Sequence, residues 1–412
     1  MIGAASEAAR MTLPPNIEHL FSPGARRALI ELRREIHRDP ELAFQEERTA
    51  KRLEAALGAL RPKEINRVAG TGVVARFAGR DHGAPVVALR GDIDALPIQE
   101  NTDLEYTSRN AGVMHACGHD VHATWAVGAA HLLTERPAAG DVLIVLQPAE
   151  ETGQGAQSVM ESGVLDGVSA IFGGHVDRRF PVGAVVAEAG PLAASADNFG
   201  IELIGSGAHA ARPHEAADPI VGAGALIGAL QTIVSRRVDP SRPAVVTIGT
   251  VNAGSAPNVI PDRATLTGTL RATDPNTRRL LHEEVARLAE AVAVAHRLRA
   301  KVAFEHGPPP IVNPTDAASW ARTAAIAVLG AEAVVPLGFV NMAAEDFAYY
   351  MERMPGCFVR VGAREPGSDP IPAHTPRFYA AEESIFVGAA VLAETARIAA
   401  VALGGETRQA AR

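Results

Sequence analysis

The chain has 412 residues, of which 47% are hydrophobic and 21% are charged, and its formal net charge at pH 7 is −8. This composition is that of a globular protein long enough for two domains, each with its own core. The negative charge and the lack of basic runs argue against nucleic acid as a partner, because nucleic acid binding needs a concentrated cationic face.

In chain order, residues 1–15 show no basic segment followed by an apolar one, and no stretch reaches the roughly 18 uninterrupted apolar residues of a membrane span. The two cysteines, Cys117 and Cys357, lie far apart and suggest no disulfide framework. We therefore expect a cytoplasmic protein with no membrane partner.

Helical and strand-like patterns alternate in the first part of the chain. Apolar residues at helical spacing predict helices over 25–38, 46–60 and 121–133. Short apolar runs predict buried strands over 72–77, 85–89, 142–146 and 170–172. This alternation is typical of an α/β fold with a mixed sheet and helices on both faces.

Acidic and histidine side chains follow three of these strands: Asp92 and Asp94, then Glu150 and Glu151, then His175. A single such residue would more often be a turn or capping residue. Because ligands of open α/β sheets bind outside the carboxyl ends of the strands, three strand ends together predict one shared site.

The run 114–122 places a thiol, three imidazoles and a carboxylate within nine residues: His115, Cys117, His119, Asp120 and His122. These are the side chains that bind ions such as Zn²⁺. Chance clustering explains the run equally well when it is taken alone, so ligands from distant segments must decide the matter.

From about residue 195 the expected order becomes β-α-β-β-α-β, which is typical of a ferredoxin-like unit. Its strands are expected over 198–204, 244–251, 264–270 and 299–304, and its helices over 217–234 and 277–295. We interpret residues 193–307 as an inserted lid domain that also mediates dimerisation, and 1–192 with 308–412 as a discontinuous metal-binding domain. A strand over 357–361 and a helix over 382–403 return to the first sheet, and 404–412 are expected to be disordered.

Several motifs of the chain occur together in one order between His37 and Phe378. They lie at 32–37, 40–42, 91–97, 114–122, 147–151, 207–214, 258–262, 268–271, 344–347 and 374–378. In this order they resemble the metal-dependent amidohydrolases that include hippurate hydrolase, auxin-conjugate (IAA-amino acid) hydrolases and N-acyl amino acid amidohydrolases, relatives of aminoacylase and the zinc carboxypeptidases.

The resemblance implies a dinuclear metal site with Cys117, His119, Glu151, His175 and His374 as ligands. Two close divalent ions need an anion between them, so Cys117, Glu151 or both are expected to bridge or neutralise the pair. The thiol stands where related families usually carry aspartate. It leaves Mn²⁺ and Zn²⁺ both open, with Co²⁺ and Ni²⁺ as further alternatives.

Four acids are expected to orient the ligands rather than bind metal: Asp92, Asp94, Asp120 and Glu345. For Glu345 the alternative is capping of a helix that begins nearby. His115 and His122 are likewise expected to give support.

The resemblance also implies roles in the reaction. Glu150, beside a metal ligand, is expected to act as general base on the metal-activated water; its alternative is a solvated loop acid. His209 in the lid is expected to stabilise the oxyanion, within one subunit or across a dimer, unless it is an ordinary surface residue. Asn258 and Arg271 are candidates to orient the substrate, although Arg271 could instead pair with a neighbouring acid.

The sequence therefore predicts a hydrolase that cleaves the amide of an N-acyl amino acid carrying an acetyl, benzoyl or similar group, and that forms a homodimer or homotetramer through the lid. One alternative is a dipeptidase or aminopeptidase, which would need an additional acid to bind a free amino terminus. The other alternative is a non-catalytic metal-binding protein. Such a protein would have lost the base or a metal ligand, whereas Glu150 and all five candidate ligands are present in this chain.

Overall fold

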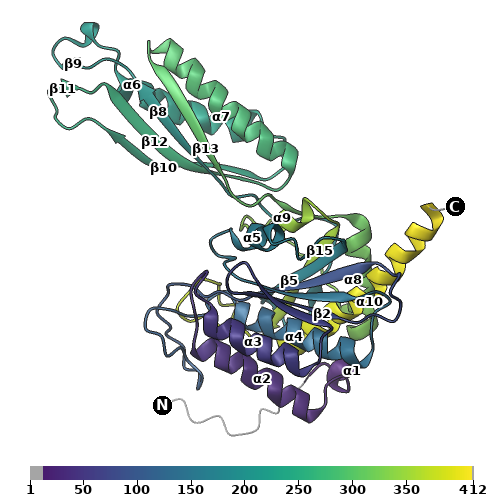
Figure 1. The fold of residues 1–412 in the computed structure, drawn as a ribbon. Coiled ribbons are helices and arrows are strands. Elements are labelled where there is room, and N and C mark those ends of the chain that lie inside the picture. Colours follow the sequence, from purple (N-terminus) through teal and green to yellow (C-terminus); the bar gives the residue numbers. More distant parts are fainter. Residues whose placement is uncertain (1–12, 411–412) are drawn as a thin grey trace. The chain divides into compact units, whose positions relative to one another are not determined.

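The structure, a computed structural model, describes residues 13–410, so most of the N-terminal segment judged for a targeting signal lies outside the described residues. The chain divides into two compact units (Figure 1). The first comprises the residues up to Gly190, Asn313–Gly338 and the residues from Tyr349. The second comprises Pro191–Val312 and Phe339–Ala348.

A mixed seven-stranded sheet forms the centre of the first unit, with the strand order β1-β2-β4-β3-β5-β15-β6. Its strands are β1 (Glu64–Val68), β2 (Gly72–Phe77), β3 (Val86–Asp92), β4 (Val142–Gln147), β5 (Val168–Pro181), β6 (Val185–Val186) and β15 (Gly356–Arg364). The neighbours β4, β3, β5 and β15 are parallel, whereas β1, β2 and β6 pair antiparallel. The expected mixed α/β fold is confirmed.

Helices pack against this sheet and enclose a large apolar core. They are α1 (Pro15–Glu18), α2 (Pro23–Arg38), α3 (Glu47–Ala59), α4 (His119–Glu135), α5 (Gly155–Glu161), α8 (Thr315–Leu329), α9 (Ala348–Met351) and α10 (Glu383–Ala410). The helix α10 packs against α4, α8 and the strands β3 and β5. The parallel strands are buried on both faces, which explains why they read as continuous apolar runs.

The expected disorder after Gly404 is wrong for the described part of that segment, because α10 continues to Ala410. Residues with high helix propensity follow the glycine pair and no proline interrupts them. By length and composition α10 and α6 (Pro219–Arg236) could each cross a membrane, but α10 is mostly buried inside the first unit.

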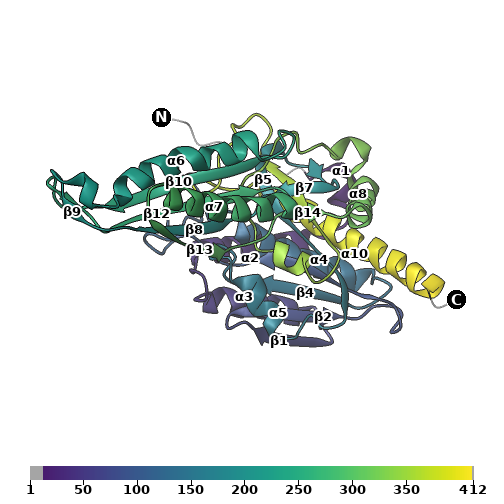
Figure 2. The same cartoon turned by 90° about the horizontal axis from the view of Figure 1, so that it is seen from above.

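The second unit has a four-stranded antiparallel sheet of order β10-β12-β8-β13. Its strands are β8 (Asp197–Ile204), β10 (Ala244–Ala253), β12 (Arg263–Ala272) and β13 (Arg299–His306). The helices α6 and α7 (Pro275–Ala295) run side by side and pack on the sheet over a second apolar core (Figure 2). This order and pairing are those of the predicted ferredoxin-like unit.

Short elements complete the second unit: the ladder of β9 (Ala208–His209) with β11 (Val259–Ile260), and that of β7 (Gly190–Ala193) with β14 (Ile311–Asn313). Residues Phe339–Ala348, expected in the first domain, belong to the second unit. Backbone and side-chain hydrogen bonds hold them there, because Ala194 N donates to Ala343 O and Asn341 Nδ2 donates to Leu192 O.

Candidate metal centre

A glycine between Cys117 and His119 lets both side chains turn toward one place. Gly118 has a φ of 93° and immediately precedes α4, whose first residue is His119. A Cβ atom at this position would lie 2.5 Å from the Cγ2 atom of Val176. Both the backbone conformation and the space therefore require glycine here.

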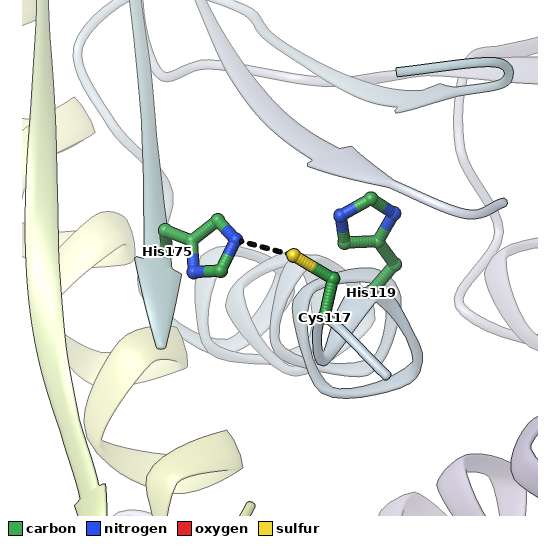
Figure 3. A group of neighbouring side chains, drawn as sticks. All are labelled: Cys117, His119 and His175. Atoms are coloured by element: carbon green, nitrogen blue, oxygen red, sulfur yellow. Dashed lines mark hydrogen bonds between the residues drawn. The ribbon is translucent and has the colours of Figure 1, made fainter. Parts of the chain in front are cut away.

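Three of the expected ligands meet around the sulfur of Cys117 (Figure 3). The Sγ atom lies 3.1 Å from Nε2 of His175, and His119 belongs to the same group of donors. Sulfur and nitrogen ligands of one tetrahedral zinc ion lie about 3.5 Å apart. The three side chains are thus close enough to share one ion.

Cys117 also belongs to a second donor group, with Glu151 and His374. The Nε2 atom of His374 lies 3.3 Å from the Cys117 sulfur and 3.3 Å from Oε1 of Glu151. The backbone N–H of His374 donates to the carbonyl of Ala116, which ties its loop to the cysteine segment. The structure therefore brings all five expected ligands together, in two groups that share one sulfur.

Two buried atoms of this cluster, Nε2 of His119 and Oε1 of Glu151, have no partner in good hydrogen-bond geometry among the described residues, although Oε1 of Glu151 is in ion-pair range of His374. They lie 3.8 Å apart. Buried polar atoms are nearly always paired, so such orphans need an explanation. A divalent cation accepts both atoms as ligands, and the residues present fit a metal site.

The side chains of the cluster differ in ionisation, and burial and the Glu151 carboxylate raise the pKa of the Cys117 thiol. Hydrogen bonds to Cys117 and Glu151 raise the pKa of His374 to about 10. Burial lowers the pKa of His175 well below its ordinary value, so this imidazole is neutral, as metal binding requires. An environment that holds a proton on His374 is rich in anions and favours cations.

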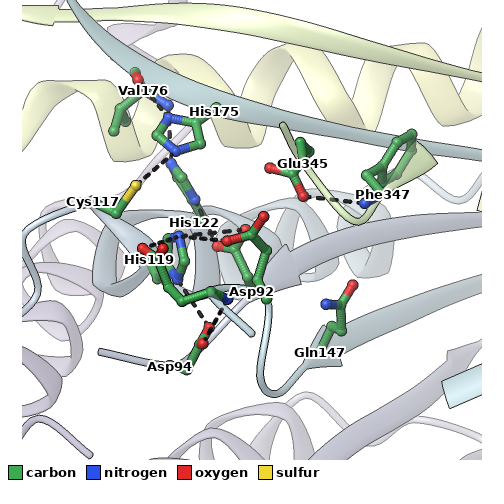
Figure 4. Close-up of polar contacts among 12 residues, drawn as sticks. Asp92, Asp94, Cys117, His119, His122, Gln147, His175, Val176, Glu345 and Phe347 are labelled. Carbon is green, nitrogen blue, oxygen red and sulfur yellow. Dashed lines mark hydrogen bonds and ion pairs between the residues drawn. The ribbon is translucent and has the colours of Figure 1, made fainter. Parts of the chain in front are cut away.

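Asp94 forms hydrogen bonds to two of the expected ligands, His119 and Glu151, and Figure 4 shows it beside His119. Its Oδ1 accepts from Nδ1–H of His119 at 3.0 Å, and its Oδ2 accepts from the backbone N–H of Glu151 at 3.0 Å. Because Nδ1 of His119 carries the proton, Nε2 is the nitrogen that faces the cluster.

Asp92, the last residue of β3, accepts a hydrogen bond from Nδ1–H of His122 at 2.7 Å. It is also paired with the buried guanidinium of Arg90. The backbone N–H of Val176 donates to the second ring nitrogen of His122 at 2.9 Å, so both nitrogens of that ring are engaged. Next to it, His175 donates from Nδ1 to the carbonyl of Val176, which leaves its Nε2 facing the sulfur.

Asp120 lies beside the ligand His119 in sequence, but its carboxylate binds elsewhere. It accepts from Nδ1 of His37 at 2.7 Å and forms an ion pair with Arg33 at 2.8 Å. These contacts anchor the start of α4 to α2. His115 is buried, and neither of its ring nitrogens has a hydrogen-bond partner in the part of the chain that the structure describes.

Glu150 lies next to the cluster, with one carboxylate oxygen 3.9 Å from Nε2 of His119. Its side chain is partly exposed, whereas that of His119 is buried. A carboxylate in this position is within reach of a water molecule held by the cluster, directly or through a short movement.

The remaining candidates, His209, Asn258, Arg271 and Glu345, lie in the second unit. His209 is exposed on β9, where it pairs with Val259 of β11, and the carbonyl of the adjacent Asn258 accepts from Ala210 N at 3.0 Å. Arg271 lies on β12 and donates to the carbonyl of Leu270. Glu345 accepts from the backbone N–H of Phe347, the residue directly before α9 (Figure 4).

Arg271 makes no ion pair with an acid among the described residues, and the acid that acts on its charge is Asp197. Its guanidinium is half-buried, and burial lowers its pKa. The Asp197 carboxylate opposes this effect and raises the pKa in part, without forming an ion pair with the guanidinium.

Arg90 is a further residue of the site that was not among the candidates predicted from the sequence. This side chain is fully buried and donates to Gln147 Oε1 at 2.9 Å as well as pairing with Asp92. A signal was present, because an arginine two residues before an aspartate on a strand lies on the same face. The prediction that His175 follows a short strand was also inexact: β5 extends to Pro181 through pairing with β15, after its pairing with β3 has ended at Phe172.

Comparison with known proteins agrees with this geometry. The model of peptidase family M20/M25/M40 matches residues 88–398. The N-acetyl-L-cysteine deacetylase of Bacillus subtilis is 43% identical over 340 residues, covering 81% of this chain and 80% of that protein. An IAA-amino acid hydrolase of Arabidopsis thaliana is 40% identical over 375 residues, covering 89% of this chain and 86% of that protein.

Among solved structures, a dinuclear metal-binding M20 peptidase of Bacillus subtilis superimposes with a TM-score of 0.82 at 38% identity, over 92% of this chain and 99% of that one. The likeness thus extends over both units rather than over the metal cluster alone. On the match to the family model and on these relatives, the chain belongs to peptidase family M20/M25/M40.

Proposed function

We propose that this protein hydrolyses the amide bond of N-acyl amino acids with two divalent metal ions. The observation that carries the proposal is the convergence of the five donors into two groups that share the Cys117 sulfur. The names of two relatives, N-acetyl-L-cysteine deacetylase and IAA-amino acid hydrolase, refer to amino acid conjugates. The substrate is accordingly an amino acid that carries an acetyl, benzoyl or similar acyl group on its nitrogen.

The donor set suits a pair of ions. When bound, two divalent ions would polarise the amide carbonyl and activate the attacking water. Cys117 would supply the anion between them, with His119 and His175 in one group and Glu151 and His374 in the other. The thiolate favours Zn²⁺ over Mn²⁺, Co²⁺ or Ni²⁺, and metal analysis of the purified protein decides among them.

Glu150 is the proposed general base. Its carboxylate lies beside the cluster and is not one of the atoms that the two groups around Cys117 require. It would take a proton from the attacking water and deliver it to the nitrogen of the leaving amino acid. Protonation of that nitrogen is needed because an amide anion is a poor leaving group.

In the second unit, Arg271 is proposed to bind the carboxylate of the substrate, because its guanidinium is half-buried and forms no ion pair among the described residues. His209 and Asn258 are exposed on neighbouring segments of that unit. We assign His209 to stabilisation of the oxyanion and Asn258 to orientation of the acyl amide.

A homodimer through the second unit is part of the proposal. The strand β10 is at the edge of its sheet and packs against α6. Side chains on both elements are exposed although apolar, among them Val221 at 55% and Val251 at 47%. An edge strand beside an apolar helix face is a surface that a second copy can cover. Both cysteines are free, in agreement with the proposed cytoplasmic location.

Substrate assays test the proposal. N-acetyl and N-benzoyl amino acids and unblocked dipeptides are assayed side by side with metal-loaded protein, and the free amine is quantified. We expect turnover of the acylated amino acids. Hydrolysis of the unblocked dipeptides alone would assign the protein to the dipeptidases instead, and no turnover of any amide by metal-loaded protein would contradict an enzymatic role.

A further inference from the structure

The turn that carries Glu150 has a strained backbone. Ala149, the residue before it, has a φ of 55°, in the left-handed region that residues other than glycine rarely adopt. Hydrogen bonds from Gly153 N to Glu150 O and from Gly155 N to Ala149 O close the turn behind the acid. Neither bond involves the N–H of Ala149, which needs an acceptor from another part of the chain.

The buried carboxylate of Glu46 accepts a hydrogen bond from the N–H of Ala149. The N–H of Ala149 donates to Oε1 of Glu46 at 3.0 Å, and the other oxygen of Glu46 accepts from the hydroxyl of Thr71 at 2.5 Å. Glu46 is 0% exposed and directly precedes α3. An unpaired buried N–H is costly, so this contact stabilises the left-handed conformation against its alternatives.

The same turn is packed closely by its surroundings. A Cβ atom on Gly155 would lie 1.7 Å from the carbonyl oxygen of Pro148, and one on Gly72 would lie 2.9 Å from the ring of that proline. The backbone before Ala149 is thus confined by packing, and the backbone at Ala149 by Glu46. Together, the packing around Pro148 and the hydrogen bond to Glu46 set the direction of the Glu150 side chain.

We propose that Glu46 is a positioning residue for the reaction: by holding Ala149 in the left-handed conformation it aims the carboxylate of Glu150 at the metal cluster. This inference rests on the proposed role of Glu150 as base. The neighbouring ligand Glu151 has its own anchor, because Asp94 accepts from its N–H. Loss of Glu46 is therefore expected to misplace the base without releasing metal.

A second acid in the same segment provides a matched control. Glu41 accepts hydrogen bonds from the backbone N–H and the hydroxyl of Thr49, at 2.9 Å and 3.0 Å. It holds the start of α3, as Glu46 does in part, but its carboxylate forms no hydrogen bond with the Glu150 turn in the described structure. A purely structural role for Glu46 would make the two substitutions equivalent.

The experiment compares Glu46→Ala, Glu46→Asp, Glu46→Gln, Glu41→Ala and Glu150→Gln in metal-loaded protein, with kcat, KM, bound metal and thermal stability measured for each. For Glu46→Ala we expect kcat to fall by about 100-fold, the effect of a base displaced by roughly 1 Å, with KM and bound metal unchanged. Glu46→Gln is expected to recover most of kcat, because its amide oxygen accepts from Ala149 and its NH₂ donates to Thr71.

If Glu46→Ala does not fold, Glu46→Asp keeps the charge but withdraws the acceptor by one methylene group, and the same loss of kcat is expected. Wild-type kcat in Glu46→Ala and Glu46→Asp, or a loss matched by Glu41→Ala, would overturn the inference while leaving the base assignment intact. Wild-type turnover of Glu150→Gln would overturn both.

Discussion

The backbone N–H of Val176 donates a hydrogen bond to Nε2 of His122 over 2.9 Å. An amide nitrogen can only donate, so Nε2 carries a lone pair and the ring proton is on Nδ1, which donates to Asp92. Burial lowers the pKa of His122, in agreement with a neutral ring. His122 therefore contacts β5 next to the candidate ligand His175 and does not itself have a free nitrogen to offer a metal ion.

Replacement of His122 by alanine is expected to weaken metal binding by about 10-fold to 100-fold without removing a binding position, because the partners of metal ligands have effects of this size. The buried N–H of Val176 would lose its acceptor, and His175 would be held less firmly. Competition with a chelator measures the affinity, and elemental analysis at saturating metal gives the stoichiometry. A single bound ion at saturation would show instead that His122 is itself a ligand.

Cys117→Ala is expected to reduce bound metal more than the loss of His175 or of His374, because only the sulfur belongs to both donor groups. Elemental analysis of the three variants measures this. Cys357→Ala is the matched control, since that thiol is buried in the apolar core and is not part of either group. A metal-replete and active Cys117→Ala protein would contradict the bridging assignment.

Glu150→Gln is expected to keep its metal and lose turnover by about 100-fold to 10,000-fold, the range for removal of a general acid–base group. The amide has nearly the same shape as the carboxylate but cannot accept a proton. Metal content and kcat measured on the same preparation separate the two effects. Loss of metal together with activity would make Glu150 a ligand rather than a base.

Much of the fold could be predicted from the sequence. The continuous apolar runs of β3 and β4 and the β-α-β-β-α-β order of the second unit are local patterns, and the structure follows them. The length of β5 is not local: its second half is held by β15, a strand that lies far along the chain. The place of Phe339–Ala348 in the second unit likewise depends on hydrogen bonds to distant residues.

The candidate ligands could be named because thiols, imidazoles and acids are chemically distinctive. The residues that position these ligands could not be identified from the sequence. Glu46 reads as an ordinary acid at a helix start, and its bond to Ala149 joins positions 103 residues apart. Arg33 and His37 read as polar positions of α2, although both are buried against Asp120. Such roles depend on tertiary contacts rather than on residue type or spacing.

The ionisation of His37 predicts how the stability of the protein depends on pH. Its two ring nitrogens face the carboxylates of Asp120 and Glu100 at 2.7 Å and 3.2 Å, and both carboxylates accept, so the ring is an imidazolium. Burial alone would lower the pKa of His37, but these acids raise it overall, even though Arg33 opposes the charge. A raised folded-state pKa stabilises the protein fully below the ordinary value of 6.5, and this stability is lost as pH rises through the folded-state value.

The free energy of unfolding of wild type and of His37→Gln, measured from pH 5.5 to pH 9, tests this. The wild type is expected to be more stable by about 1–3 kcal/mol at the acid end of the range. That advantage should shrink as the pH rises. An advantage that grows with pH would mean that the ring is neutral in the folded protein.

The exposed apolar side chains of α6 and β10 lead to the last prediction. Val221→Glu and Val251→Glu each place a charge on the surface proposed to bind a second copy, and burying an unpaired charge is highly unfavourable. Both variants are expected to sediment as monomers where the wild type sediments as a dimer. Val294→Glu, on the exposed side of α7 at 72% exposure, is the matched control and is expected to leave the assembly unchanged. A monomeric wild-type protein would contradict the proposed dimer. Val221 and Val251 variants that remain dimeric would place the contact between copies on another surface.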